Sequence, residues 1–207
     1  MLGVVNYGSG NYQSLCNALD FLLIDYLEIK TGQDLAEVSH IILPGVGAFN
    51  DCMARLNNLK LVNDLRREVL ENKKLFLGIC VGHQVLMSWG TEFDKKEGLG
   101  WIKGSTEKLI SKDNMPVPHI GWTEVNYSGD NQLFNKIDPG STFYFVHSYY
   151  VVLGDNEDTL ATAQYGSVFV AAIQRDNIFG VQFHPEKSQE NGLQLLRNFS
   201  EMKSSVI

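Results

Sequence analysis

One cysteine stands where a nucleophile can be held. Cys80 lies in LFLGICVGHQVL, residues 75–86, with Gly78 and Gly82 two places away on either side. The apolar run before it predicts a strand and the residues after it a helix, which is the form of a nucleophile elbow, where the neighbouring positions must lack bulk. A helix start favours a thiolate, and the Val81 N–H there can stabilise an oxyanion. The alternative is a small buried cysteine at a tight turn.

The base for such a nucleophile is expected in a distant segment. His83 is close in sequence, but the first turn of a helix depresses imidazole basicity, so we expect His83 to pack or to face a partner. FGVQFHPEKS, residues 179–188, places His184 and Glu186 two positions apart after an apolar strand, on one side of an extended chain. The carboxylate can then orient the imidazole, as in a catalytic triad. The alternative is a solvated turn at a strand end.

The segment PGVGAF, residues 44–49, is a candidate for a second oxyanion donor. Its glycines allow backbone amides near Val46 and Gly47 to face a ligand. Taken alone, the pattern is explained better by a plain strand-to-helix turn. The other two cysteines, Cys16 and Cys52, lie in or near helical apolar patterns, and we expect both to pack in the core.

These candidates require a fold that brings distant segments to one edge of a sheet. Continuous apolar runs, each followed by a helical pattern, predict buried parallel strands at 2–7, 40–45 and 74–79. Closely spaced strand patterns between residues 141 and 184 are typical of an antiparallel meander. Ser188 is expected to cap a last helix. We therefore predict an α/β fold with a mostly parallel central sheet, flanking helices and an antiparallel C-terminal portion, and ligands gather at the carboxyl ends of such parallel strands.

The composition favours one globular domain over residues 1–207, with 44% hydrophobic and 20% charged residues. No apolar run of about 20 residues predicts a membrane span, and the N-terminus has no secretory signal pattern. The net charge of −7 disfavours binding to nucleic acid. Three cysteines without a CxxC pair disfavour a disulfide framework and a zinc site, and they favour the reducing cytoplasm. We expect no metal and no cofactor.

Three segments together resemble one enzyme family. PGVGAF, GICVGHQ and FHPEKS are similar, in order and separation, to the signatures of class I glutamine amidotransferases. VNYGSGN, PHIGW, YFVHSYY and GVQFHPEKS further resemble the glutaminase subunits of imidazole glycerol phosphate synthases, over about residues 2–200. The resemblance implies a flavodoxin-like fold and a triad of Cys80, His184 and Glu186 that hydrolyses L-glutamine through a thioester.

The resemblance also implies substrate contacts and a partner. Glutamine would be held by Gln84, Glu92, His147, Ser148 and Tyr149. A (β/α)₈-barrel cyclase, joined as a heterodimer, would receive the ammonia for imidazole glycerol phosphate formation in histidine biosynthesis. Its interface would include Asn6, Gly8, Asn11, Pro118, His119 and Trp122. Structural alternatives are a helix-capping role for Gln84, a strand aromatic for Tyr149, and surface positions for His119 and His147.

The chain departs from the family pattern at four positions, none of them in the triad. Asn6 stands where Asp is frequent, Val81 where Leu is usual, His83 where Met is usual, and Thr123 where Asn is usual. These departures bear on the partner and the ammonia acceptor. Three alternatives stay open: a barrel paralogue that aminates a bacterial surface sugar, a stand-alone cysteine hydrolase of γ-glutamyl or peptide bonds, and a binding module with an inert thiol.

Overall fold

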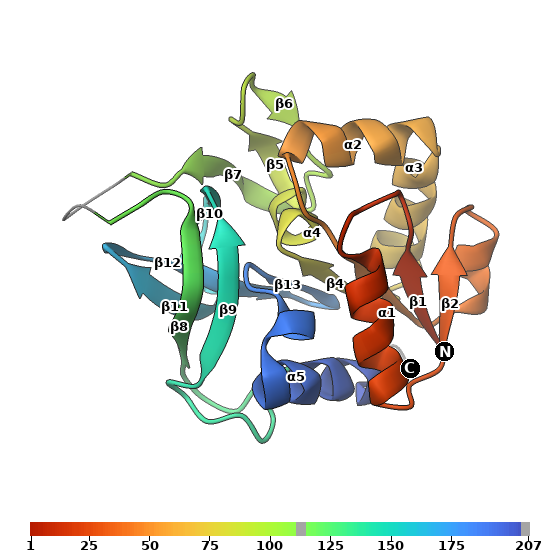
Figure 1. Ribbon diagram of the computed structural model, residues 1–207. Helices are drawn as coiled ribbons and strands as arrows, with labels where there is room; N and C mark the ends of the chain where they lie inside the picture. Colours follow the sequence, from red (N-terminus) through yellow and green to blue (C-terminus); the bar gives the residue numbers. More distant parts are fainter. Residues whose placement is uncertain (111–114, 204–207) are drawn as a thin grey trace.

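The chain is built around one large mixed sheet, seen in a computed structural model that describes residues 1–110 and 115–203 (Figure 1). Within these residues nine strands form it, in the order β2-β1-β3-β4-β13-β12-β11-β8-β9. The parallel half contains β2 (Tyr26–Ile29), β1 (Leu2–Val5), β3 (His40–Leu43), β4 (Leu75–Ile79) and β13 (Ile178–Val181). The antiparallel half contains β12 (Ser167–Arg175), β11 (Thr159–Tyr165), β8 (His119–Tyr127) and β9 (Thr142–His147).

The parallel half is buried on both faces, which explains its continuous apolar strands. Every residue of β1, β4 and β13 is buried. In Figure 1 the helices α1 (Tyr12–Phe21) and α5 (Gln189–Glu201) lie in front of this half. Helix α3 (Leu61–Arg66), which follows α2 (Phe49–Asn58) in the chain, lies behind it. The strand order 2-1-3-4-13 is the flavodoxin-like arrangement, so the predicted fold class is confirmed. The edge strand β2 was not predicted, because its short, half-buried run carries no clear pattern.

The predicted antiparallel meander is only partly correct, because it is divided between two sheets and its last strand, β13, also pairs parallel with β4. The run 141–152 was predicted as one strand unit, but it splits at Ser148 into β9 and β10 (Tyr149–Leu153). β10 joins a second sheet with β7 (Ile102–Lys108), β5 (Met87–Gly90) and β6 (Lys96–Glu97). The PHIGW segment leads into strand β8, with Pro118 just before it, and the residues of β8 alternate between exposed positions and buried or half-buried ones, as in a sheet with one solvent face.

The smaller elements include one that differs from expectation. The helix expected after Cys80 is a single turn, α4 (Val81–Gln84), so its dipole is small. The remaining short elements are η1 (Asp34–Glu37), the π-helical turn η2 (Arg67–Glu71), η3 (Asn156–Asp158) and η4 (Pro185–Lys187). Among the described residues, no helix has the length and apolar character needed to cross a membrane.

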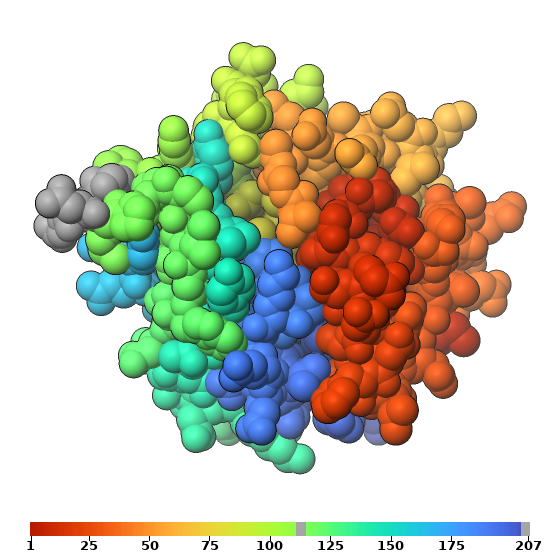
Figure 2. All heavy atoms as spheres, viewed as in Figure 1, coloured from red at the N-terminus to blue at the C-terminus, as the bar shows by residue number. Residues whose placement is uncertain are grey.

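Two adjacent parallel strands decide where the functional residues meet. β4 and β13 pair with Ile79 opposite Val181, and the Cys80 N–H donates to the Val181 carbonyl at 2.8 Å. The chain segments that follow both strands therefore leave the sheet at the same edge, as parallel strands require. Figure 2 shows part of the blue C-terminal segment at the surface between the red N-terminal helix and the green-to-cyan strands.

Candidate active site

Cys80 occupies a strained turn between β4 and α4. Its φ of 53° and ψ of −104° lie outside the regions that non-glycine residues favour, so the elbow predicted from the glycine spacing is confirmed. A Cβ on Gly78 would lie 2.4 Å from the Gly82 carbonyl oxygen, and one on Gly82 would lie 1.9 Å from the Leu43 carbonyl oxygen. The glycines are therefore needed for the close approach of backbone to backbone at the turn.

The structure brings His184 and Glu186 together beside Cys80. Glu186 lies in η4, which begins four residues after the end of β13, and its Oε1 is 2.8 Å from His184 Nδ1. Both side chains are fully buried, so the solvated-turn alternative is excluded. The other ring nitrogen of His184, Nε2, is buried without a hydrogen-bond partner among the described residues. The carboxylate thus orients the ring through Nδ1 and leaves Nε2 available for proton transfer.

The electrostatic environment favours a protonated His184. Burial lowers the pKa of the imidazole, but the electrostatic effect of the adjacent Cys80 sulfur and the hydrogen bond and charge of Glu186 together outweigh burial and raise the pKa to about 10. Burial raises the pKa of Glu186, but the hydrogen bond and charge of His184, together with the hydrogen bond from Asn11, outweigh burial, so the net shift is downward. The arrangement stabilises an imidazolium between the Glu186 carboxylate and the cysteine sulfur, and a neighbouring imidazolium favours a thiolate nucleophile.

Asn11, predicted at a partner interface, supports the triad carboxylate from a buried position. Its side chain is buried, and Nδ2 donates to Glu186 Oε1 at 3.1 Å. Ser9 Oγ in turn donates to Asn11 Oδ1 at 2.6 Å. Ser188 differs from expectation as well: its side chain does not cap α5 but donates from Oγ to the His184 carbonyl at 2.6 Å. These contacts link α1 and α5 to the His184 segment.

Gln182 is a site residue that we did not predict from the sequence. It is fully buried, and its Nε2 lies 3.7 Å from Cys80 Sγ. The same amide accepts a hydrogen bond at Oε1 from Gln84 Nε2, at 3.2 Å. Its position two residues before His184, on the same side of an extended chain, was a signal that could have identified it. The helix-capping alternative for Gln84 is wrong, because Nε2 also donates to the Tyr149 carbonyl at 2.9 Å.

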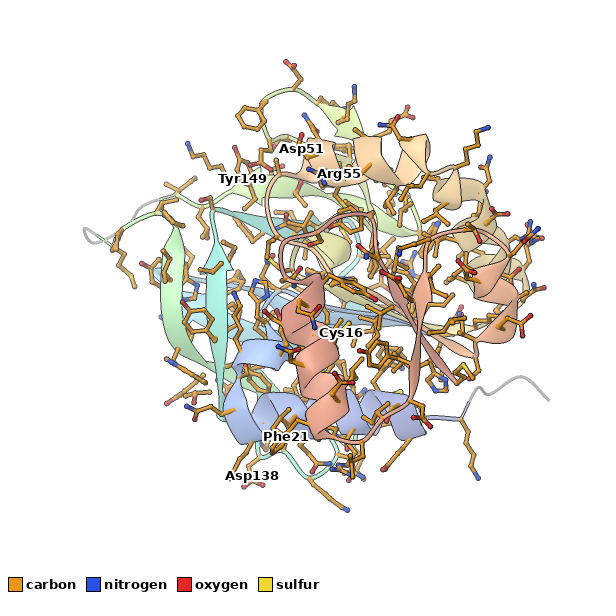
Figure 3. All side chains as sticks on the ribbon, turned by 45° about the vertical axis from the view of Figure 1, so that its right-hand side comes forward. Cys16, Phe21, Asp51, Arg55, Asp138 and Tyr149 are labelled. Carbon is orange, nitrogen blue, oxygen red and sulfur yellow. The ribbon has the colours of Figure 1, made fainter. Side chains whose placement is uncertain are left out.

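A cavity of about 360 Å³ opens beside the sulfur. Its wall includes Cys80 and all five residues that the resemblance assigned to substrate binding, namely Gln84, Glu92, His147, Ser148 and Tyr149. Glu92 Oε2 accepts from the Phe49 N–H at 2.9 Å, so the start of α2 fixes this carboxylate. In Figure 3, Tyr149 lies at the same end of the molecule as Asp51 and Arg55 of α2, away from Phe21 and Asp138.

The two segments expected to bind an oxyanion differ in whether their backbone N–H groups are free to donate. Val81, Val46 and Gly47 all line the cavity. The Val46 N–H, however, donates to Ser9 Oγ at 3.3 Å, so Val46 is not an available oxyanion donor in this structure. Val81 is the first residue of α4, and the N–H groups of a first helical turn have no partner inside the helix.

Three histidines for which a surface or partner-facing position was considered are buried, and His147, at 5% exposed, is one of them. His83 is fully buried, which excludes a partner-facing role and leaves the packing role. His119, predicted both as an interface residue and, alternatively, as a surface residue, is 1% exposed, so its ring does not reach a partner directly. Its neighbour Trp122 is 46% exposed and remains an interface candidate, as do Asn6, Gly8 and Pro118. Cys16 and Cys52 are buried in the core, as expected.

Comparisons with known proteins agree with this geometry. The family model described as glutamine amidotransferase class I matches residues 4–202. A relative from Leptospira borgpetersenii is 41% identical over 206 residues, covering 98% of this chain and 100% of the relative. A second, from Moorella thermoacetica, is 42% identical over 201 residues, covering 97% and 94%. Both are described as imidazole glycerol phosphate synthase subunit HisH.

A solved structure shows the same fold at much lower sequence identity. The structure of PurLQS from Thermotoga maritima has a TM-score of 0.74 and 21% identity, with 96% of each chain covered. The family match spans nearly the whole chain, and it includes the strained cysteine turn and the segment that carries the His–Glu pair. On these grounds, the chain belongs to the class I glutamine amidotransferase family.

Proposed function

We propose that this chain is the glutamine-hydrolysing subunit of an imidazole glycerol phosphate synthase and that it passes ammonia to a (β/α)₈-barrel partner in histidine biosynthesis. The observation that carries the proposal is the meeting of Cys80 with the buried His184–Glu186 pair beside a cavity of amino-acid size. Support for the pathway comes from relatives at 41–42% identity over nearly the full chain, which are described as that subunit.

The proposed chemistry follows from the triad. The Cys80 thiolate attacks the side-chain carbonyl carbon of glutamine, and the carbonyl oxygen becomes an oxyanion facing the Val81 N–H. Collapse of this intermediate breaks the carbon–nitrogen bond, and His184 donates its proton to the departing nitrogen, which leaves as ammonia. Water then attacks the thioester and gives its proton to His184, releasing glutamate and restoring the thiolate. Glu186 stays ionised and holds the imidazole in place through both steps.

The cavity supplies groups suited to an amino-acid substrate. About 360 Å³ lies within the range of small-molecule clefts. We assign the Glu92 carboxylate to the ammonium group of glutamine, because opposite charges in a partly desolvated cleft attract strongly. The backbone and side chains of the 147–149 segment face the rest of the substrate. No cofactor enters the proposed reaction.

The partner is proposed to contact the outward face of β8. Ile120 and Trp122 alternate with inward-facing residues and are 59% and 46% exposed, which leaves two large apolar side chains in solvent. Apolar and aromatic side chains of this kind are enriched in the cores of protein interfaces. Pro118, just before this strand, also lines the cavity, so a partner at β8 would lie close to the released ammonia.

The test combines one substitution with two nitrogen sources. In the complex with the co-purifying synthase, Cys80→Ala is expected to abolish glutamine-dependent synthesis and to leave synthesis from ammonium salt intact. Cys16→Ala removes an equally buried thiol on α1 and is the matched control. Loss of both activities in Cys80→Ala would assign the cysteine a structural role and refute the mechanism.

The same preparation separates the alternative functions. A partnered glutaminase is slow alone and accelerates when synthase and acceptor bind, whereas a stand-alone hydrolase is fast without them. The acceptor that stimulates glutamate release distinguishes imidazole formation from sugar amination. A binding module with an inert thiol would leave Cys80 unlabelled by an electrophilic glutamine analogue.

A further inference from the structure

A row of buried and half-buried polar groups connects β8 to the wall of the cavity. His119 of β8 and His147 of β9 are paired across the two strands, and His119 Nδ1 lies 3.0 Å from His147 Nε2. His119 Nε2 lies 2.8 Å from Thr123 Oγ1, and His147 Nδ1 lies 2.9 Å from the Tyr149 carbonyl oxygen. We call Thr123, His119, His147 and the Tyr149 carbonyl the histidine network. Both residues are buried, with exposed fractions of 1% for His119 and 5% for His147.

The acceptor at one end fixes the direction of every bond in the network. A carbonyl oxygen only accepts, so His147 Nδ1 carries a proton and donates it to Tyr149. In a neutral ring the other nitrogen is then an acceptor, so His119 Nδ1 must be the donor between the two histidines. His119 Nε2 in turn accepts from the Thr123 hydroxyl. Burial keeps both rings neutral, because it lowers the pKa of His119 to about 4 and is the main cause that lowers the pKa of His147 to about 3.

The histidine network ends on the Tyr149 carbonyl, which is also hydrogen-bonded to the first of the amide side chains that lead to Cys80. The Tyr149 carbonyl accepts a second hydrogen bond, from Gln84 Nε2 at 2.9 Å. Gln84 contacts Gln182, whose Nε2 lies 3.7 Å from Cys80 Sγ. The backbone at Tyr149 is thus held between His147 on one side and the cysteine-facing amides on the other. A shift of this carbonyl would move the cavity wall formed by residues 147–149.

We propose that Thr123 and His119 are positioning residues that set the tautomer and orientation of His147 and, through it, the glutamine-binding wall at residues 147–149. Neither residue lines the cavity, so both act through His147. The proposal rests on the proposed function, because it assumes that glutamine occupies this cavity. It also gives a role to Thr123, one of the positions at which the chain departs from its family pattern.

A packing role for His119 is the competing explanation. The ring stacks on Tyr165 with 3.9 Å between centroids and on Phe145 with 5.1 Å. Stacking accounts for an aromatic ring at position 119, and phenylalanine would satisfy it equally. It does not account for hydrogen-bond partners at both ring nitrogens, or for the hydroxyl at Thr123.

The experiment compares variants that keep shape and change only polar groups, assayed for glutamate release in the complex with the co-purifying synthase. Thr123→Val removes the hydroxyl, and we expect a rise in KM for glutamine of roughly 3- to 10-fold, the effect of one hydrogen bond, with kcat changed less than twofold. Thr123→Ser restores the hydroxyl and is expected to restore KM. Thr162→Val makes the same change on β11, outside the network, and is the matched control.

His119→Phe keeps the stacking and removes both nitrogens, so we expect a KM increase at least as large as that of Thr123→Val. Imidazole ¹⁵N spectra of the full chain give a second readout. The wild-type protein is expected to show a proton on Nδ1 of both His119 and His147, and His119→Phe is expected to change the His147 signals.

Wild-type kinetics in both Thr123→Val and His119→Phe would overturn the positioning role, as would a proton on Nε2 of His119. Failure of Thr123→Ser to restore KM would assign the Thr123 effect to packing and overturn its hydroxyl role. A wild-type complex that releases no glutamate would instead overturn the proposed function, and with it any role of the network toward glutamine, whichever tautomers the spectra show.

Discussion

We predict that His83→Met makes folding less sensitive to acid without slowing glutamine hydrolysis. His83 is fully buried behind Cys80, and neither ring nitrogen has a hydrogen-bond partner among the described residues. A Cβ on Gly180 would lie 2.4 Å from His83 Nδ1, so the ring is packed tightly against β13. These surroundings disfavour a protonated imidazole, because a buried charge without a partner is strongly unfavourable.

The magnitude follows from the pKa difference between the folded and unfolded chain. Burial, with a smaller effect from the charge of His147, lowers the pKa of His83 to about 3, whereas an unfolded histidine titrates near 6.5. Between these values the unfolded state binds a proton that the folded state does not, so stability falls as pH falls below about 6.5. From pH 7.5 to pH 5.0 this linkage removes roughly 2 kcal/mol, and the figure hardly changes for any folded-state pKa below about 4.

The assay is urea unfolding at pH 7.5 and pH 5.0 for the wild type, His83→Met and His83→Gln. Both variants remove the titrating ring, so each is expected to lose roughly 2 kcal/mol less than the wild type between the two pH values. The glutamine variant keeps a buried polar group, so it separates titration from packing. At pH 7.5 we expect Met to be the more stable of the two variants, because its flexible thioether fills the space and needs no hydrogen bond.

Two results would refute this reasoning. If His83→Met lost as much unfolding free energy between pH 7.5 and pH 5.0 as the wild type, His83 would not be the group that takes up a proton on unfolding. If the same variant slowed glutamine hydrolysis as much as His184→Ala, the assignment of the catalytic base to His184 would be wrong. The structure predicts a kcat within twofold of the wild type.

Two further predictions concern the triad and its turn. Glu186→Gln keeps the shape but not the charge next to His184 Nδ1, and we expect kcat to fall roughly 10²- to 10⁴-fold with a smaller change in KM. The same substitution at the exposed Glu190 is the control. An unchanged kcat in Glu186→Gln would contradict the triad. Gly82→Ala places a Cβ 1.9 Å from the Leu43 carbonyl oxygen. We expect urea unfolding to show a free energy of unfolding lower by roughly 1–3 kcal/mol, and we expect reduced glutamate release. An unchanged free energy of unfolding would mean that the turn accommodates the methyl group without strain.

The local features of the site could be predicted from the sequence. The glycines around Cys80 reveal a turn that only small neighbours permit, and the spacing of His184 and Glu186 places both side chains on one side of the chain. Three of the parallel strands, β1, β3 and β4, were visible as continuous apolar runs, because burial on both faces requires them. Each of these signals depends on residues only a few positions apart.

The tertiary structure decided what supports these residues. Asn11 reaches Glu186 across 175 positions, so this contact has no local pattern. Gln182 reaches Cys80 across 102 positions, and its spacing from His184 indicates only that both side chains lie on one side of the chain. The occupied Val46 N–H, and the buried His119 beside His147, likewise depend on neighbours far apart in the chain. The physical reason is that the local sequence determines the backbone conformation and the face of each element that is buried. The polar partner of a buried group depends instead on which strands lie side by side. The pairing of β13 with β4 and of β8 with β9 is a property of the whole sheet.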